Sequence, residues 1–341
     1  MKILFPYHSI FLITIFVYFF HNANCQDTLK ISGSVSLETA EVKWVNQWPL
    51  SKESGVKTGV KEWLKRIILG EKTPALSKPI SVLAVDTNSL WVLDQGNNAV
   101  FKVGKKLSGT SSILKTRNVD FQSLIGICAF QNNEVLFTDS YLNKIFIVPA
   151  DKKACEVLND SLVLEQPTGI AYSKLTGQIW VVETSAHRIS VLNEKGELIK
   201  RIGKRGTAFG DFNYPTNIWI DNEGNIYIID SMNFRVQVLN KDGEVISVFG
   251  TSGDASGYFA RPKGIATDSY GNIYVSDALF HVVQIFDING NFLYKFGSQG
   301  QDEGQFWMPS GIYIDADDYI YVADSYNSRV QIFQLTNCVK K

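Results

Sequence analysis

Short apolar strands separated by polar turns recur along most of this chain. Between residues 80 and 333 the same unit appears six times: an apolar strand, a turn, a second apolar strand and then an acidic residue. The acidic residues lie 45, 44, 47, 47 and 47 residues apart, at Asp94, Asp139, Glu183, Asp230, Asp277 and Asp324. A β-rich repeat of this period is typical of a propeller in which each repeat forms one four-stranded blade. The pattern therefore predicts an all-β, six-bladed β-propeller.

The later repeats show the unit most clearly. In one of them, residues 214–221 and 226–230 are rich in β-branched and aromatic residues, and a Gly- and Asn-containing turn separates them. A polar stretch follows, and residues 235–239 then continue as a third strand. Strands of this composition, bounded by Gly, Asn, Asp or Pro, are typical of a β-meander.

The repeats also carry recognisable motifs. Pro-x-Gly-Ile begins at Pro262 and Pro309, Asn-x-Arg-Val-Gln-Ile-Phe begins at Asn327, and a linker of the form Phe-Gly to Pro runs over 249–262 and 296–309. These residues resemble the NHL repeat, strongly over about 200–335 and more weakly over 78–200. The resemblance implies a six-bladed propeller of NHL type over 78–336, with a tail at 337–341. It says little about function, because propellers serve many unrelated functions.

Composition agrees with one large β domain. Hydrophobic residues make up 45% of the 341 residues and aromatic residues 12%, enough to fill the layers between six blades. The 33 basic and 34 acidic residues nearly balance, and no basic stripe suited to a phosphate backbone is present. A nucleic-acid partner is therefore not expected.

The first 25 residues are typical of an export signal. Lys2 is followed by an apolar run over 10–20, and cleavage after Cys25 would leave Gln26 as the first residue. Two alternatives are a lipidated Cys25 and an uncleaved membrane anchor. We expect an exported protein, in the periplasm, in the cell envelope or secreted, that contacts membrane only through such an anchor or lipid.

Residues 26–77 do not belong to a repeat. Residues 41–49 alternate as a strand would, and apolar residues at helical spacing predict a short helix over 60–69. The sixth repeat has only three strands, and an incomplete last blade would leave the backbone N–H and C=O groups of its outer strand unpaired. The strand near 41–48 is therefore expected to pair with residues 328–335 and to close the ring.

The six acidic residues allow two interpretations. They could form a ring of carboxylates, or each could accept backbone N–H bonds from the turn that leads to the third strand of its blade. A residue that recurs in every blade favours the structural interpretation. Functional residues are then expected where the blades differ.

The loops after the second strands and the linkers between blades should emerge on one face, called here the looped face. Several loop tips are apolar, including Tyr141, Phe234, Phe280 and Tyr326. Exposed aromatic residues on one face favour a surface that binds a protein, a peptide or a glycan. Alternatively, some of these residues fold inward and seal neighbouring blades.

Two histidines occupy equivalent positions in these loops, His187 and His281. The segment ending at His281 resembles the peptidyl-hydroxyglycine lyase propeller, a resemblance that implies a histidine ligand for zinc at this position. That family uses three histidines, whereas this chain offers two, and a catalytic zinc normally has three protein ligands. We expect both to be exposed rim residues of the ligand-binding looped face, and we expect no cofactor. The alternatives are zinc held by His187 and His281, or calcium.

Asn217 and Lys263 are the residues expected at the central channel. Asn217 stands where most repeats have glycine, as at Gly264. Calcium-dependent lactonases of six blades hold their cation with such side chains, but one substitution gives too few ligands, so Asn217 is interpreted as a hydrogen-bonding plug. The sequence thus favours a non-catalytic binding scaffold, with a metal-dependent lyase or hydrolase acting at the channel as the alternative.

Overall fold

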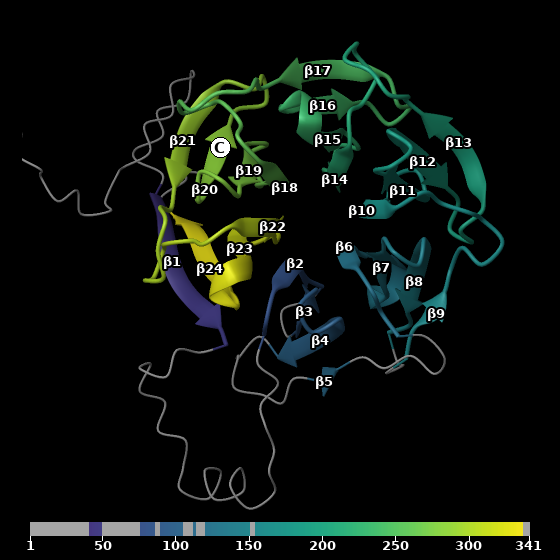
Figure 1. The fold of residues 1–341 in the computed structure, drawn as a ribbon, viewed down its shortest axis with the longest axis horizontal. Coiled ribbons are helices and arrows are strands. Elements are labelled where there is room, and N and C mark those ends of the chain that lie inside the picture. Colours follow the sequence, from purple (N-terminus) through teal and green to yellow (C-terminus); the bar gives the residue numbers. More distant parts are fainter. Residues whose placement is uncertain are drawn as a thin grey trace, which may run out of the picture.

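The computed structural model describes residues 41–49, 76–85, 89–104, 112–113, 120–150 and 154–336. Here the chain forms six four-stranded antiparallel sheets, arranged as blades around a central axis (Figure 1). The described residues contain no α-helix, only the 3-10 turns η1 (Gln131–Asn133), η2 (Ser231–Asn233) and η3 (Ser325–Asn327). None of these elements is long and apolar enough to cross a membrane. The predicted six-bladed propeller is confirmed.

The first five blades each take four consecutive strands. Blade one contains β2 (Pro79–Ala84), β3 (Ser89–Asp94), β4 (Ala99–Gly104) and β5 (Ser112–Ile113), and blade two contains β6 (Leu124–Ala129), β7 (Val135–Asp139), β8 (Lys144–Val148) and β9 (Glu156–Val157). Blade three contains β10 (Pro167–Ser173), β11 (Gln178–Glu183), β12 (Arg188–Leu192) and β13 (Leu198–Ile202), and blade four contains β14 (Pro215–Ile220), β15 (Ile226–Asp230), β16 (Arg235–Leu239) and β17 (Val245–Phe249). Blade five contains β18 (Pro262–Thr267), β19 (Ile273–Asp277), β20 (Val282–Phe286) and β21 (Phe292–Phe296). Within each blade the first strand is innermost (Figure 1).

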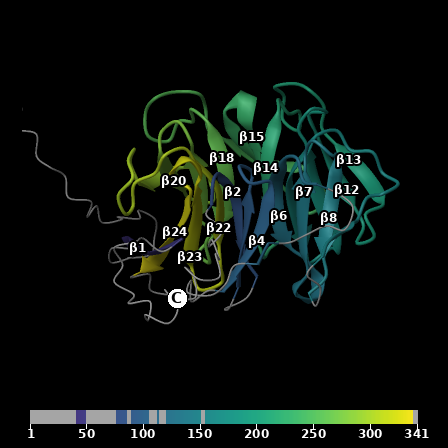
Figure 2. The same cartoon turned by 60° about the horizontal axis from the view of Figure 1, so that its bottom comes forward.

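The sixth blade combines the two ends of the described chain. Its strands are β22 (Pro309–Ile314), β23 (Tyr319–Asp324), β24 (Arg329–Thr336) and β1 (Glu41–Trp48), in the order β1-β24-β23-β22. Glu41 lies opposite Thr336 and Trp48 opposite Val330, so β1 runs antiparallel to β24. Both views show β1 beside β24 (Figures 1 and 2). The predicted closure of the ring by the N-terminal strand is confirmed.

Three sequence predictions lie outside the described residues. They are the export signal at 1–25 with Cys25, the helix at 60–69, and the tail at 337–341. They remain predictions.

The six acidic residues at the ends of the second strands serve their blades. All six are fully buried. Asp277 accepts N–H bonds from Ala260 and Arg261 in the preceding linker and from Leu279 and Phe280 in the following loop. In every blade the carboxylate accepts a backbone N–H from the preceding linker, and Asp94, Asp139 and Asp277 also accept one from the turn before the third strand. The carboxylates therefore serve their blades, as the structural interpretation predicts.

Paired arginines complete this arrangement in three blades. Arg235 Nε donates to Asp230 and Arg329 Nε to Asp324, each at 2.8 Å, and Arg188 pairs with Glu183. Burial would raise the pKa of Glu183, but hydrogen bonds from Arg188 and Ser190 outweigh it and leave that pKa below its ordinary value. The arginine of the Asn-x-Arg-Val-Gln motif therefore neutralises a buried acid.

Glycine lets the inner strands approach closely near the middle of the channel. A Cβ atom on Gly169 would lie 2.8 Å from the Cα of Asn217, and one on Gly311 would lie 2.8 Å from the Cα of Ser81. Contacts this short exclude any side chain at these two positions. The glycines therefore mark a waist where the inner strands of neighbouring blades touch.

Candidate functional site: the central cavity

A cavity of about 600 Å³ occupies the axis of the ring. The inner strands line it, together with the turns that follow them at 173–175, 221–223, 268–271 and 315–316. It opens on the face that carries these turns, called here the turn face. The loops after the second strands emerge on the opposite side. This candidate site is thus on the face opposite to the one that sequence reasoning selected.

Two aromatic side chains dominate the cavity wall. Trp219 of β14 and Tyr313 of β22 meet edge to face, with ring centroids 5.6 Å apart and planes at 69°. Trp219 Nε1 donates to Thr267 Oγ1 at 2.9 Å, which fixes the orientation of the indole. The two strands flank β18, where the equivalent residue is Ala266, so the small side chain leaves room for the rings to meet.

The cavity also presents polar groups without protein partners. The Tyr313 hydroxyl has no hydrogen bond within the described part of the chain, and burial, followed by the charge of Asp315, raises its pKa to about 12. It is therefore a neutral donor and acceptor at pH 7. Asn217 accepts the N–H of Ile218 at its Oδ1 at 2.7 Å, and its Nδ2 has no partner among the described residues.

The aspartates at the mouth of the cavity have a structural role. Asp221 accepts the N–H groups of Glu223 and Asn225 and the hydroxyl of Tyr227. Asp268 makes the equivalent bonds in the next blade, and burial raises its pKa. Carboxylates engaged in this way hold the turns in shape. The groups left for a ligand include aromatic rings, a hydroxyl and an amide, with the charged side chains of Lys174 and Glu223 at the mouth.

Both predicted histidines bind the backbone of a linker. His187 Nδ1 accepts the N–H of Tyr214, and His281 Nδ1 accepts the N–H of Met308, both at 3.1 Å. Neither lines the cavity, and His187 is 7% exposed, so it is not an exposed residue of the rim. Over the residues that the structure describes, no three His, Cys, Asp or Glu side chains are grouped to hold a metal ion.

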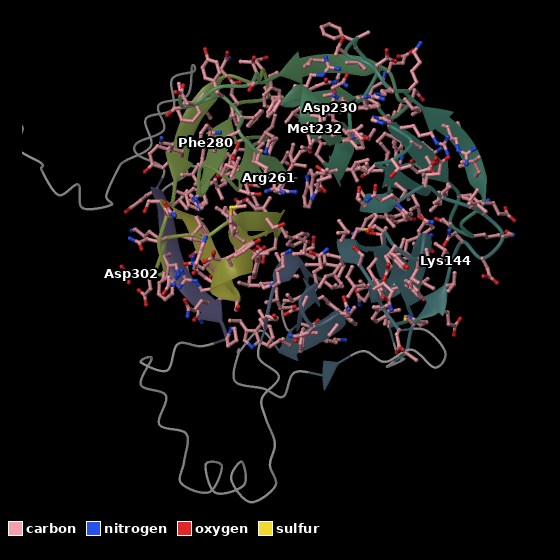
Figure 3. The ribbon with its side chains drawn as sticks, viewed as in Figure 1. Lys144, Asp230, Met232, Arg261, Phe280 and Asp302 are labelled. Carbon is pink, nitrogen blue, oxygen red and sulfur yellow. The ribbon has the colours of Figure 1, made fainter. Side chains whose placement is uncertain are left out.

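The predicted loop tips divide into two groups. Tyr141 and Tyr326 are 74% and 53% exposed. Phe280 is half-buried, and Phe234 packs against the core between blades four and five. Figure 3 shows Phe280 over the body of its blade, away from the central opening. A partner-binding role for the exposed pair remains a prediction.

Of the two predicted channel residues, only Asn217 lines the cavity. Lys263 is not part of the cavity lining, because it precedes the glycine waist along β18. Sequence reasoning missed Trp219 and Tyr313 as site residues. Their signal was present: at this position of the inner strand the other blades have the smaller residues Leu83, Cys128, Ala171 and Ala266.

Comparison with known proteins agrees with this architecture. Residues 306–333 match the NHL repeat, and residues 157–247 match a family described as a 6-bladed beta-propeller. The chain is a six-bladed β-propeller that carries an NHL repeat over residues 306–333. No curated protein matches this propeller by sequence.

Solved structures show the same fold in proteins of different function. The propeller is 13% identical to an auxiliary nutrient binding protein from Bacteroides thetaiotaomicron, with a TM-score of 0.62 over 76% of this chain and 70% of that one. A similarly described protein from Bacteroides ovatus is 14% identical, with a TM-score of 0.60 over 77% and 70%. Virginiamycin B lyase from Staphylococcus aureus is 16% identical, with a TM-score of 0.56 over 77% and 98%. At these identities the likeness concerns the fold alone.

Proposed function

We propose that this propeller is an exported, non-catalytic binding protein whose central cavity holds a saccharide. The observation that carries the proposal is the pair Trp219 and Tyr313, which line a cavity of about 600 Å³. Ligand sites in proteins are typically cavities of roughly 300–1,000 Å³ with apolar walls and a few placed polar groups. Sugar rings present apolar faces that stack on aromatic rings and hydroxyls that need hydrogen-bond partners.

The polar groups of the cavity suit such a ligand. Tyr313 offers a hydroxyl and Asn217 an amide N–H, and neither group has a protein partner in the described region. Both side chains are only partly buried, so ligand hydroxyls would take the place of water at these groups. The fold likeness to proteins named as nutrient binding is compatible with this class of ligand. The proposal includes no metal or other cofactor.

Titration calorimetry with a panel of neutral mono- and oligosaccharides tests this proposal. We expect at least one to bind, with an affinity that survives dialysis against chelator. Tyr313→Phe removes only the hydroxyl and should weaken binding roughly tenfold, the loss expected for one hydrogen bond of about 1.4 kcal/mol. Trp219→Ala should weaken it further by removing the stacking surface.

The matched control is Phe209→Ala, which removes an aromatic ring that is 76% exposed in the linker before β14 and does not line the cavity. This variant should bind the saccharide as the unchanged protein does. Equal loss in Trp219→Ala and Phe209→Ala, or no binding by any member of the panel, contradicts the proposal. Binding that disappears in chelator would favour the metal-dependent alternative.

A further inference from the structure

Lys263 has an unusual position at the looped-face end of the channel. It is the bulged residue of β18, between Pro262, which lies opposite Asp277, and Gly264, which lies opposite Ser276. The other inner strands place uncharged residues at this position: Ile80, Ile125, Thr168, Thr216 and Ser310. Six inner strands surround the axis, so these residues encircle the channel, and Lys263 carries the only charge in the circle.

The ammonium group of Lys263 is unpaired. Within the described part of the chain its Nζ makes no hydrogen bond and no ion pair. Burial, followed by the positive charges of Arg261 and Lys78, lowers its pKa to about 8. Burying a charge without a partner is unfavourable, so a propeller selected for stability alone would place an uncharged residue here, as its other blades do.

The two neighbouring cations also lack acidic partners. Arg261 is exposed, and its guanidinium makes no hydrogen bond to a described residue; Figure 3 shows Arg261 beside the central opening. Lys78 Nζ lies 5.8 Å from the centre of the Tyr326 ring. Asp94 and Asp277 accept the backbone N–H groups of Lys78 and Arg261 at 3.0 Å, and both also accept N–H bonds from their own loops.

Aromatic rings adjoin this basic cluster. The Tyr326 ring, over which the Lys78 ammonium lies, is next to the Trp307 ring. The two ring centroids are 5.9 Å apart and the ring planes meet at 35°. Both rings are exposed, at 53% and 41%. Positive charge next to two exposed, mutually tilted rings suits a ligand that combines an anionic group with a flat or cyclic body.

We propose that Lys263, Arg261 and Lys78 form a second binding site, at the looped-face mouth of the channel, for the anionic group of an acidic saccharide. A carboxylate or sulfate would receive charge-assisted hydrogen bonds from the three cations, while the sugar ring packs on Tyr326 and Trp307. The glycine waist separates this site from the cavity that Trp219 and Tyr313 line, so the two sites can be tested independently.

Calorimetry at low ionic strength with D-glucuronate, D-glucose and inorganic sulfate tests the proposal. We expect glucuronate to bind, glucose to bind at this site at least tenfold more weakly, and Lys263→Met to weaken glucuronate binding about tenfold or more. Lys295→Met, which removes an exposed lysine from β21, is the matched control and should change nothing.

The comparison of the two anions identifies the source of the charge. Glucuronate binding more tightly than sulfate, with both weakened in Lys263→Met, supports an acidic saccharide. Equal, Lys263-dependent binding of both supports the anion site but assigns it to free anions rather than to sugars. No binding of either anion, or affinities unchanged in Lys263→Met, overturns the proposal. A second readout is the Nζ resonance of Lys263, whose pKa should rise above about 8 when the anion is bound.

Discussion

The loop tips of the looped face differ in what their aromatic side chains contact. Phe234 packs against the core between blades four and five, whereas Tyr141 is 74% exposed. We expect Phe234→Ser to destabilise the protein by roughly 2–4 kcal/mol, because it removes buried apolar surface and leaves a void. Tyr141→Ser, the matched control, should change the free energy of unfolding by less than about 0.5 kcal/mol. Equal effects in urea unfolding would show that this division of the tips is wrong.

Lys263 supplies a pH-dependent prediction. Burial lowers its pKa in the folded protein to about 8, below the value of about 10.4 in an unfolded chain. The unfolded state therefore binds more protons between about pH 8 and 10.4, and the stability contributed by this residue rises with pH across that window. Below about pH 8 the unfavourable contribution is fully present.

Lys263→Met should consequently stabilise the protein at pH 7 by roughly 1–3 kcal/mol once solvent screening is allowed for, and by much less at pH 10. Urea unfolding at the two pH values measures the difference, and Lys295→Met serves as the control. A variant that is less stable than the parent at pH 7 would mean that Lys263 has a stabilising partner in the folded protein.

At the scale of elements, closure depends on β1. The strand pairs with β24 from Glu41 to Trp48, and the Trp48 ring packs 6.0 Å from Phe101 of the first blade. Arg329, which pairs with the buried Asp324, also donates from Nη1 to Gln47 Oε1 at 3.0 Å. The arginine of this ion pair therefore also binds the closing strand. Removing β1 would expose the edge of β24 and part of the core between blades six and one.

We therefore expect deletion of residues 26–50 to broaden thermal unfolding and to lower its midpoint. Differential scanning calorimetry of the full and truncated chains measures both quantities. A protein that begins near residue 76 and melts as cooperatively as the full chain would contradict a closing role for β1.

At the scale of the whole molecule, the fold followed from the sequence because each blade repeats the same requirements. The acid that accepts a linker N–H recurs in all six units, and the missing strand of the last blade required a partner from elsewhere in the chain. The site was harder to predict. Asn217 was identified as a departure from glycine, but Trp219 and Tyr313 lie in different blades, and only the closed ring brings them into contact.

The histidines were misplaced for a local reason. His187 and His281 have φ values of 52° and 59°, and in this left-handed turn both side chains reach a linker N–H. A position in a loop predicts that a side chain is exposed. The left-handed turn that directs these two histidines to the linker cannot be inferred from loop position alone. The face on which the cavity opens also depends on where the inner strands separate beyond the glycine waist. That separation is a property of the assembled ring.

The most direct test of a ligand-binding central cavity is a crystal structure of the propeller with the neutral saccharide that calorimetry identifies. The sugar is predicted to lie on the turn face, in contact with Trp219 and Tyr313 and within hydrogen-bonding distance of the Tyr313 hydroxyl or Asn217 Nδ2. A saccharide bound only on the looped face, with the cavity holding solvent, would contradict the proposed function.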